Sequence, residues 1–192
     1  YYYQVNAFDD ELYGKAIRAM DKAIALYPDR LDFRFMKANA YIAYEKESPD
    51  MALPYLLDLA GREKERKWTY EDQVIEKGFF EDAMQEYCYS FYSIGTPAAY
   101  DAFLALSQKL ASLYPDYLDF SNNIGSYHMI AKEDYKAALK QYAKVIKKDP
   151  SNYTAIKNSV LAARKMGNVK SEKKYLQMLI EHGSETEKLA AQ

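Results

Sequence analysis

An eight-residue segment that occurs twice constrains the fold of this chain more than any other feature. Residues 26–33 read LYPDRLDF, residues 113–120 read LYPDYLDF, and a weaker copy, KDPSNY, occupies residues 148–153. In each copy an apolar helical pattern ends just before a proline, because proline disfavours helical backbone in the residue that precedes it. A short polar turn follows, and then a second helical pattern begins. The chain is therefore expected to stack repeated helix–turn–helix units into an extended array.

Apolar residues recur with the 3.6-residue period of a helix along most of the chain. We expect nine helices at most and no strand. Ser48, Pro49 and Asp50 have the pattern of a helix N-terminus, with a cap, a proline in the first turn and an acid beside it. Thr96 and Pro97 repeat the first two features. The expected helices cover residues 9–27, 31–44, 49–63, 70–93, 97–115, 118–132, 134–147, 153–166 and 169–182, and residues 184–192 could begin a capping helix.

The expected helices form pairs within a single helical-repeat domain that covers residues 1–192. The first helices of the pairs begin near Leu31, Glu81, Leu118 and Tyr153. The last two spacings, 37 and 35 residues, are similar, and the first is longer by about 16 residues. We place this insertion near residues 61–80. The units then lie near residues 31–63, 81–115, 118–150 and 153–183, after a leading unpaired helix at residues 9–27.

The most regular unit resembles the tetratricopeptide repeat family. Gly125 takes the glycine position of the first helix, and Ala138 and Tyr142 take the small and aromatic positions of the second. Ser121 and His128 replace large aromatic residues of the family pattern. The resemblance implies an all-α fold, a right-handed α-solenoid of antiparallel helix pairs in which small side chains let helices approach closely. It also implies a concave groove that holds peptides.

By the same resemblance, one side of each first helix lines the groove. Mixed aromatic, amide and charged side chains there suit an extended peptide whose backbone and side chains both need partners. Most of the 20 tyrosines are expected in the core, but Tyr89 and Tyr92 fall on the groove side of their helix. The expected peptide-binding residues are Asp32, Phe35, Asn39, Asp82, Gln85, Tyr89, Tyr92, Asn122, Ser126, Met129, Lys157 and Arg164.

Composition and charge argue against several function classes. The net charge is −2, with +6 over residues 131–192 and −8 over residues 1–130, and the basic residues are spread through helices, so nucleic-acid binding is not expected. No run is long and apolar enough to span a membrane. Cys88, the single cysteine, is expected to be a buried structural thiol. His128 and His182 lack metal-ligand spacing, and no catalytic motif is present, so we expect no enzyme activity, metal or cofactor.

The sequence therefore predicts a non-enzymatic scaffold that binds a protein or peptide, and self-association through the terminal helices stays open. Two other hypotheses are kept. Trp68 and Tyr70, with nearby aromatic residues, could stack on a glycan or small ligand, or the chain could be a regulatory domain of a longer protein. Because the chain begins with Tyr1 rather than methionine, we expect an upstream segment, and cytoplasmic and exported locations both stay open.

Overall fold

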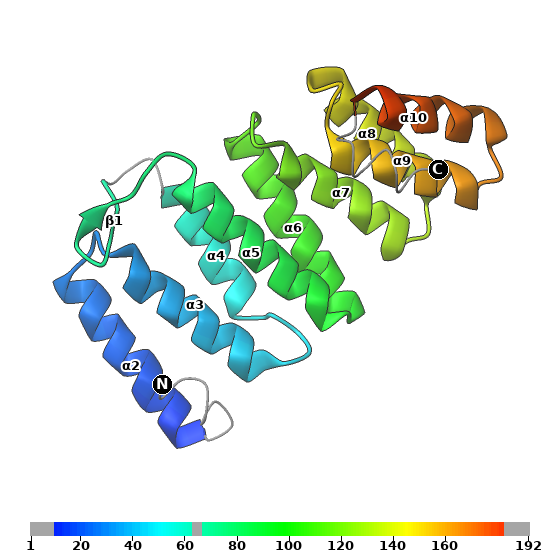
Figure 1. The fold of residues 1–192 in the computed structure, drawn as a ribbon. Coiled ribbons are helices and arrows are strands. Elements are labelled where there is room, and N and C mark those ends of the chain that lie inside the picture. The colour runs from blue at the N-terminus through cyan, green and yellow to red at the C-terminus, as the bar shows by residue number, and fades with distance from the viewer. Residues whose placement is uncertain (1–9, 63–66, 183–192) are drawn as a thin grey trace. The chain divides into compact units, whose positions relative to one another are not determined.

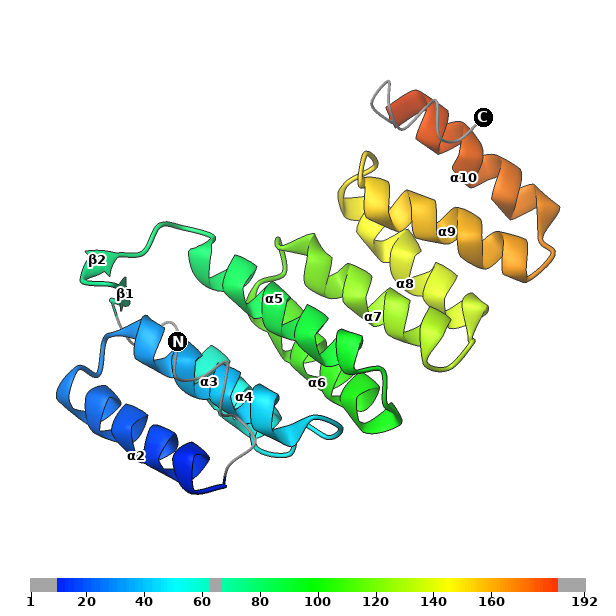
Figure 2. The same cartoon turned by 60° about the horizontal axis from the view of Figure 1, so that its bottom comes forward.

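The structure is a computed structural model that describes residues 10–62 and 67–182. Nine α-helices and one two-stranded hairpin make up these residues, so the helical class expected from the sequence is confirmed (Figure 1 and Figure 2). The capping helix expected at residues 184–192 lies outside the described residues. The elements are α2 (Asp10–Leu26), α3 (Leu31–Glu45), α4 (Ala52–Arg62), β1 (Thr69–Tyr70), β2 (Gln73–Val74), α5 (Phe79–Ile94), α6 (Pro97–Leu113), α7 (Leu118–Ile130), α8 (Tyr135–Lys148), α9 (Tyr153–Lys165) and α10 (Val169–His182).

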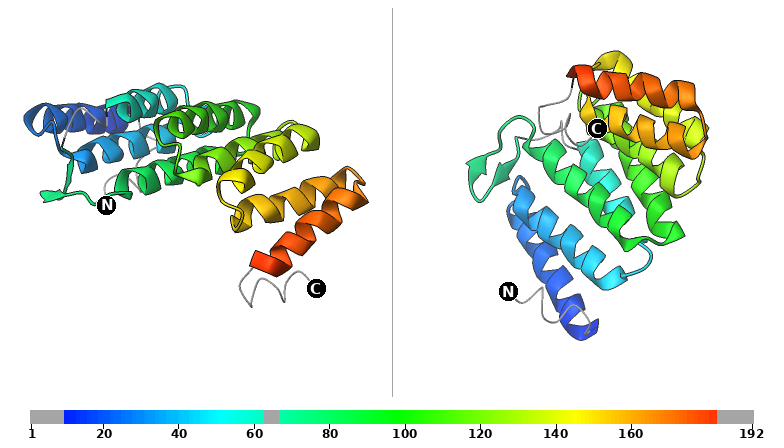
Figure 3. Two further views of the ribbon diagram at one scale, coloured as in Figure 1. Left: turned by 90° about the horizontal axis from the view of Figure 1, so that it is seen from above. Right: turned by 45° about the vertical axis from the view of Figure 1, so that its right-hand side comes forward.

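The chain divides into two compact units, residues 1–109 and residues 110–192, and the boundary falls within α6. In the first unit α3 packs against α2, against α4 and against β1. In the second unit α7 packs against α8, and α9 packs against both α8 and α10 (Figure 2 and Figure 3). From α2 to α4 and from α7 to α10, each helix thus packs against the helix that follows it in sequence.

The three sequence copies form the same backbone turn. The amide of the residue before each proline, which is Tyr27, Tyr114 or Asp149, donates to the carbonyl four residues earlier at 2.8, 2.8 and 2.9 Å. The carbonyl of that same residue accepts from the amide three residues later, at 3.1 Å in all three copies. The turn between helices that the repeated segment predicts is therefore confirmed at each position.

A close crossing of two helices lies in the second unit, between α7 and α8. A Cβ atom built on Gly125 would lie 2.4 Å from Cε1 and 2.7 Å from Cζ of Tyr142, whose side chain is fully buried. Any side chain larger than hydrogen would therefore separate the two helices or move the ring. Ala138 and Val145 belong to the same buried cluster as Tyr142. The glycine, alanine and tyrosine positions of the sequence pattern thus meet at one crossing.

Residues 67–78 form a hairpin and a turn where the sequence predicted the start of a long helix. The strands β1 and β2 pair antiparallel, and α5 begins only at Phe79, after Gly78 in a left-handed conformation with φ 95°. Glu71 and Asp72 also have positive φ, 48° and 67°, which suits the two-residue turn of a hairpin. The expectations of a helix from residue 70 and of no strand are therefore wrong.

The start of α4 is capped by the preceding helix rather than by Ser48. The two oxygens of the Glu45 carboxylate accept hydrogen bonds from the amides of Met51 and Ala52. The Ser48 hydroxyl donates instead to the carboxylate of Asp50, at 2.8 Å. Because Glu45 satisfies the first free amides, α4 needs no cap from the turn, and the cap predicted at Ser48 is wrong.

The helix end predicted at Gly95 and the helix start predicted at Thr96 and Pro97 are confirmed. Gly95 ends α5 in a left-handed conformation, with φ 76°, which is the usual role of a glycine after a helix. Thr96 Oγ1 accepts a hydrogen bond from the Ala99 amide at 3.2 Å, and Pro97 is the first residue of α6.

Candidate functional site

One side of α3 is exposed to solvent. Met36, Asn39 and Ala43 lie on it, with the spacing of three or four residues that places side chains on one face of a helix. The opposite side of α3 packs against α4, where the rings of Tyr41 and Tyr55 meet at 5.5 Å between centroids. The exposed side of α3 therefore faces away from α4.

The helix α5 has a similar exposed side. Asp82, Glu86, Tyr89 and Ser93 recur every three or four residues along the helix, and all four are exposed. Tyr89 presents 49% of its surface to solvent. The stripe thus combines two carboxylates, a hydroxyl and an aromatic ring in one line.

The opposite side of α5 is buried against α6. The Ser107 hydroxyl donates to the Cys88 sulfur at 3.5 Å, and the Tyr92 ring lies 5.5 Å from the Phe103 ring. Cys88 is fully buried, as the sequence predicted. Tyr92, expected in the groove, packs instead towards α6, and the exposed stripe of α5 faces away from that helix.

Aromatic contacts join α3 to α5. The Phe35 ring lies 5.6 Å from the Tyr87 ring and 6.5 Å from the Phe80 ring. The Tyr87 hydroxyl donates to the Phe35 carbonyl at 3.1 Å, and burial raises the pKa of Tyr87, so that the hydroxyl keeps its proton. These contacts place α3 beside α5 in the first unit (Figure 1). The two stripes, each facing away from the second helix of its pair, together make up the exposed surface of α3 and α5. We call it the α3–α5 face; its exposed residues are Met36, Asn39, Ala43, Asp82, Glu86, Tyr89 and Ser93.

The α3–α5 face contains three of the groove residues expected from the sequence, Asn39, Asp82 and Tyr89. Phe35 and Gln85, also expected in the groove, are buried. Phe35 still contributes to the face, because its contacts hold the two helices together. The remaining expected residues of the first unit point elsewhere, Tyr92 towards α6 and Asp32 towards the hairpin.

Four exposed members of the face, Met36, Ala43, Glu86 and Ser93, were not among the residues expected from the sequence. Met36 lies four residues after Asp32, and Glu86 lies four residues after Asp82. Helical spacing alone would have included both of them.

In the second unit, the residues expected on α7 are structural. Asn122 is 2% exposed, and its side-chain amide donates to the Asn152 side chain at 3.1 Å. Ser126 shares a hydrogen bond of 3.1 Å with the Tyr142 hydroxyl, and Met129 packs against the buried cluster around Tyr142. These three side chains point towards α8 and the turn before α9, and their role in a groove stays a prediction.

The two residues expected on α9 are exposed. The Lys157 ammonium lies 5.6 Å from the centre of the Tyr153 ring. Arg164 Nε donates to the Glu172 carboxylate of α10 at 2.7 Å, an exposed ion pair of the kind that contributes little to stability. Both cations are available to solvent on the surface of the second unit.

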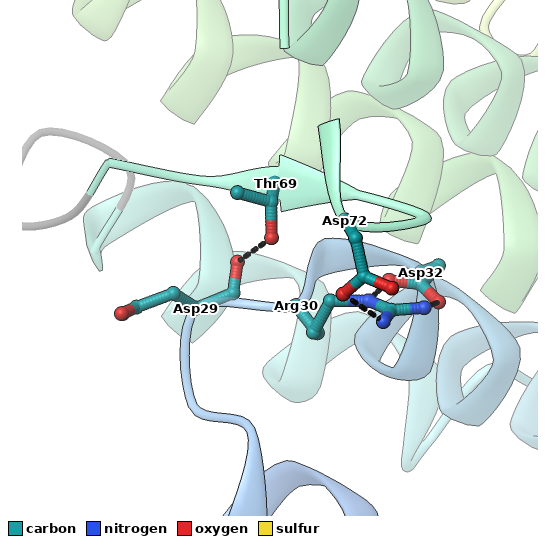
Figure 4. Close-up of polar contacts among 5 residues, drawn as sticks. All are labelled: Asp29, Arg30, Asp32, Thr69 and Asp72. Atoms are coloured by element: carbon teal, nitrogen blue, oxygen red, sulfur yellow. Dashed lines mark hydrogen bonds and ion pairs between the residues drawn. The ribbon is translucent and has the colours of Figure 1, made fainter. Parts of the chain in front are cut away.

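Arg30 fixes the hairpin to the turn between α2 and α3 (Figure 4). Its guanidinium donates to the two Asp32 oxygens at 2.7 and 2.6 Å, and to the Asp72 carboxylate at 2.5 Å. The Thr69 amide donates to the Asp29 carbonyl at 2.9 Å. Hydrogen bonding to the Arg30 guanidinium holds the pKa of Asp32 below its usual range. Asp32 is therefore a buried partner of Arg30, and its role in a groove stays a prediction.

Trp68 is part of the core under the hairpin. It is 2% exposed, and the Arg34 guanidinium lies 5.1 Å from the centre of its ring. A buried indole has no free face for a sugar ring, so the glycan hypothesis loses the tryptophan on which it was based. Tyr70, the other aromatic residue of that hypothesis, lies 5.2 Å from the Phe79 ring.

Within residues 10–62 and 67–182, no three His, Cys, Asp or Glu side chains are grouped so that they could hold a metal ion. In the same ranges, no helix is both long enough and apolar enough to cross a bilayer. His128 lies beside Tyr127, with 5.6 Å between the rings. That the protein has no catalytic activity stays a prediction.

No protein-family model matches this chain, and a search of curated proteins finds no match. The sequence pattern and the geometry described above therefore carry the functional argument by themselves.

Proposed function

We propose that this protein is a non-enzymatic scaffold that binds a protein or peptide on the α3–α5 face. One observation carries the proposal: α3 and α5, which a buried aromatic contact joins, each carry an exposed stripe of side chains, with Met36 and Asn39 on α3 and Glu86 and Tyr89 on α5. The Phe35–Tyr87 contact and its hydrogen bond hold the two helices at a fixed spacing. A partner would meet side chains that are already in position, which reduces the ordering cost of binding.

The composition of the face suits protein recognition. Tyr89 is 49% exposed and Met36 is 38% exposed, so each offers apolar area that a partner can bury. Tyrosine is among the residues that dominate binding energy in interfaces, because it combines a large rigid ring with a hydroxyl. Asn39 and Glu86 can hydrogen-bond a partner around those two apolar anchors.

We also propose that the helices form a right-handed array of the tetratricopeptide repeat kind. The starts of α7 and α9 are 35 residues apart, and those of α8 and α10 are 34 apart, close to the period of that family. The three equivalent turns and the Gly125–Tyr142 crossing support the same proposal. In that family the exposed side of the first helices binds peptides, and the α3–α5 face belongs to the first helices of two pairs.

Selection from a random 12-residue phage-display library would test the proposed function. Peptides selected on the purified wild-type chain would be labelled and titrated by fluorescence anisotropy against Tyr89→Ala. The matched control is Tyr27→Ala, because Tyr27 is an exposed tyrosine outside the α3–α5 face. We expect Tyr89→Ala to weaken binding by about 5- to 30-fold, as loss of an aromatic anchor does, and the control to change it less than about twofold. Peptides that bind both variants equally would exclude this face as the site.

A further inference from the structure

We propose that Tyr13 and Tyr44 form a site of oxidative modification, at which a one-electron oxidant joins the two rings as dityrosine. Tyr13 lies in the first turn of α2 and Tyr44 in the last turn of α3. Their rings are stacked and nearly parallel, with 3.9 Å between centroids and 6° between planes. Aromatic pairs are usually separated by about 4.5–7 Å, so these two rings are in unusually close contact. Neither residue belongs to the α3–α5 face.

The orientation of this pair distinguishes it from two other tyrosine pairs in the described chain. The rings of Tyr41 and Tyr55 meet at 5.5 Å and 75°, and those of Tyr92 and Tyr100 at 5.8 Å and 55°. Dityrosine forms between ring carbons next to the one that carries the hydroxyl, where a tyrosyl radical has much of its unpaired electron. A close parallel stack brings those carbons over the partner ring, whereas a tilted pair holds edges against faces. The stacked pair is therefore the best placed of the three for coupling.

A proton acceptor is already in place for the oxidation of Tyr44, whose hydroxyl donates to the Asp10 carboxylate at 2.7 Å. Loss of an electron makes a phenol strongly acidic, so the proton of oxidised Tyr44 passes along this hydrogen bond and leaves a neutral radical. By contrast, the Lys37 ammonium lies 5.5 Å from the centre of the Tyr41 ring and 5.3 Å from that of Tyr55. Its positive charge opposes removal of an electron from those rings. The nearby charges thus favour oxidation at Tyr44.

The reaction removes two electrons and two protons in all. One electron leaves each ring for the oxidant, which is a peroxidase or a photo-oxidised metal complex. The Tyr44 proton goes to Asp10 and on to water, and the Tyr13 proton goes to water. The two radicals then form one carbon–carbon bond between ring carbons ortho to the oxygens. The hydrogen on each bonded carbon moves to the oxygen of its own ring, which restores both aromatic rings and both hydroxyls.

The cross-link would join α2 covalently to α3, against which it packs. It would close a loop from residue 13 to residue 44, and closing a loop lowers the entropy of the unfolded chain, as a disulfide does. The oxidised protein should therefore unfold at a higher temperature than the untreated one. Met51 is the competing target, because its sulfur lies 3.8 Å from the Tyr13 hydroxyl and can oxidise to a sulfoxide.

The experiment illuminates the dilute full chain with ruthenium tris-bipyridine and persulfate, which becomes two sulfate ions as it takes up the two electrons. Digestion of the denatured monomer with trypsin and a glutamate-specific endoproteinase separates residues 12–15 from residues 38–45. We expect these two peptides to be linked, with the sum of their masses less two hydrogen atoms, and fragmentation to place the bond on Tyr13 and Tyr44. The yield should exceed that of a Tyr92–Tyr100 product by about tenfold, because the reacting rings are oriented beforehand.

Conservative variants identify the reacting pair. Tyr13→Phe and Tyr44→Phe should each abolish this product, whereas the matched control Tyr92→Phe should leave its yield unchanged. Asp10→Asn keeps an acceptor for the hydrogen bond but removes the base, so it should lower the initial rate several-fold. Far-UV circular dichroism would establish that each variant folds.

Three outcomes would overturn the proposed site. An equal yield of the same product in concentrated urea would show that the folded stack plays no part in the coupling. Oxidation of Met51 to the sulfoxide without the cross-link would show that the tyrosine pair is not the target, and so would cross-links that form only between chains. An unchanged rate in Asp10→Asn would refute the role of the carboxylate as the proton acceptor.

Discussion

Replacing Gly125 with alanine tests the close approach of α7 and α8. The new Cβ atom would lie within 2.4–2.8 Å of three carbon atoms of the Tyr142 ring, where about 3.4 Å or more is normal. The ring is fully buried and its hydroxyl is hydrogen-bonded to Ser126 at 3.1 Å, so it cannot swing away without breaking that bond. Overpacking of this kind costs up to about 3 kcal/mol, and alanine in a helix returns about 1 kcal/mol relative to glycine. We therefore expect the free energy of unfolding to fall by about 2 kcal/mol.

Urea unfolding followed by far-UV circular dichroism would measure this change. In a thermal scan the same loss corresponds to about 4–8 °C for a chain of this size. The matched control is Gly61→Ala in α4, because no atom lies within 4 Å of the position of its Cβ and the residue is exposed. The control should be as stable as wild type or up to about 1 kcal/mol more stable. The double variant Gly125→Ala plus Tyr142→Leu should lose less stability than the two single changes added together, since a smaller side chain relieves the clash. A Gly125→Ala protein as stable as the Gly61→Ala control would refute the close crossing.

Arg30→Ala should lower the free energy of unfolding, measured by urea unfolding, more than Asp72→Asn does, because it leaves the Asp32 carboxylate, which is largely shielded from solvent, without its cation. Asp72 is exposed, so its loss should change stability little. Equal losses for the two variants would contradict the geometry of Figure 4. Arg30 lowers the pKa of Asp32 in the folded state. The ionised Asp32 carboxylate therefore contributes its full stabilisation at pH values above its unfolded pKa of about 4, and this stabilisation is lost as the pH falls through the folded pKa. The difference in the free energy of unfolding between wild type and Arg30→Ala should therefore shrink in acid. A difference that stays constant down to pH 2 would count against an ion pair between Arg30 and Asp32. Trp68, the single tryptophan, should emit at short wavelength and resist quenching by iodide until the protein unfolds, and efficient quenching of the native protein would show that it is exposed. The Cys88 thiol should react with a disulfide reagent only after unfolding, and rapid native reaction would contradict its burial.

The helix junctions could be predicted because their signals are local. A proline fixes its own backbone and disfavours helix in the residue before it, so the turn after α2 and the turn after α6 have the same hydrogen bonds wherever they occur in the fold. A close approach of α7 and α8 could also be predicted, since the tetratricopeptide-like sequence pattern places a glycine on the first helix and an aromatic residue on the second.

The hairpin could not be predicted, because contacts distant in sequence stabilise it. Its turn residues, Glu71 and Asp72, lack the glycine or asparagine that usually marks a two-residue turn. Asp72 is instead paired with Arg30, which is 42 residues earlier in the chain. The burial of Trp68 under Arg34 is likewise a tertiary contact. The helical period of this segment therefore does not predict its structure, because its conformation depends on another part of the first unit.

The candidate site was predicted in part, for a similar reason. Exposure of Asn39 and Tyr89 follows from helical spacing, which the sequence contains. The orientation of Asn122 depends on its hydrogen bond to Asn152, 30 residues later, and no local pattern reveals that contact. Spacing within one helix thus identifies a surface, whereas the rotation of α7 is set by the turn against which it packs.

The measurement that tests the central claim most directly is a two-dimensional ¹⁵N nuclear magnetic resonance titration of the full chain with a library-selected peptide. If the α3–α5 face is the binding site, the backbone amides that shift should cluster around Met36 and Asn39 on α3 and around Glu86 and Tyr89 on α5. Amides on the far side of the same helices, such as that of Cys88, should shift less. Shifts confined to α8, α9 and α10 would contradict the assignment of the binding surface to the first unit.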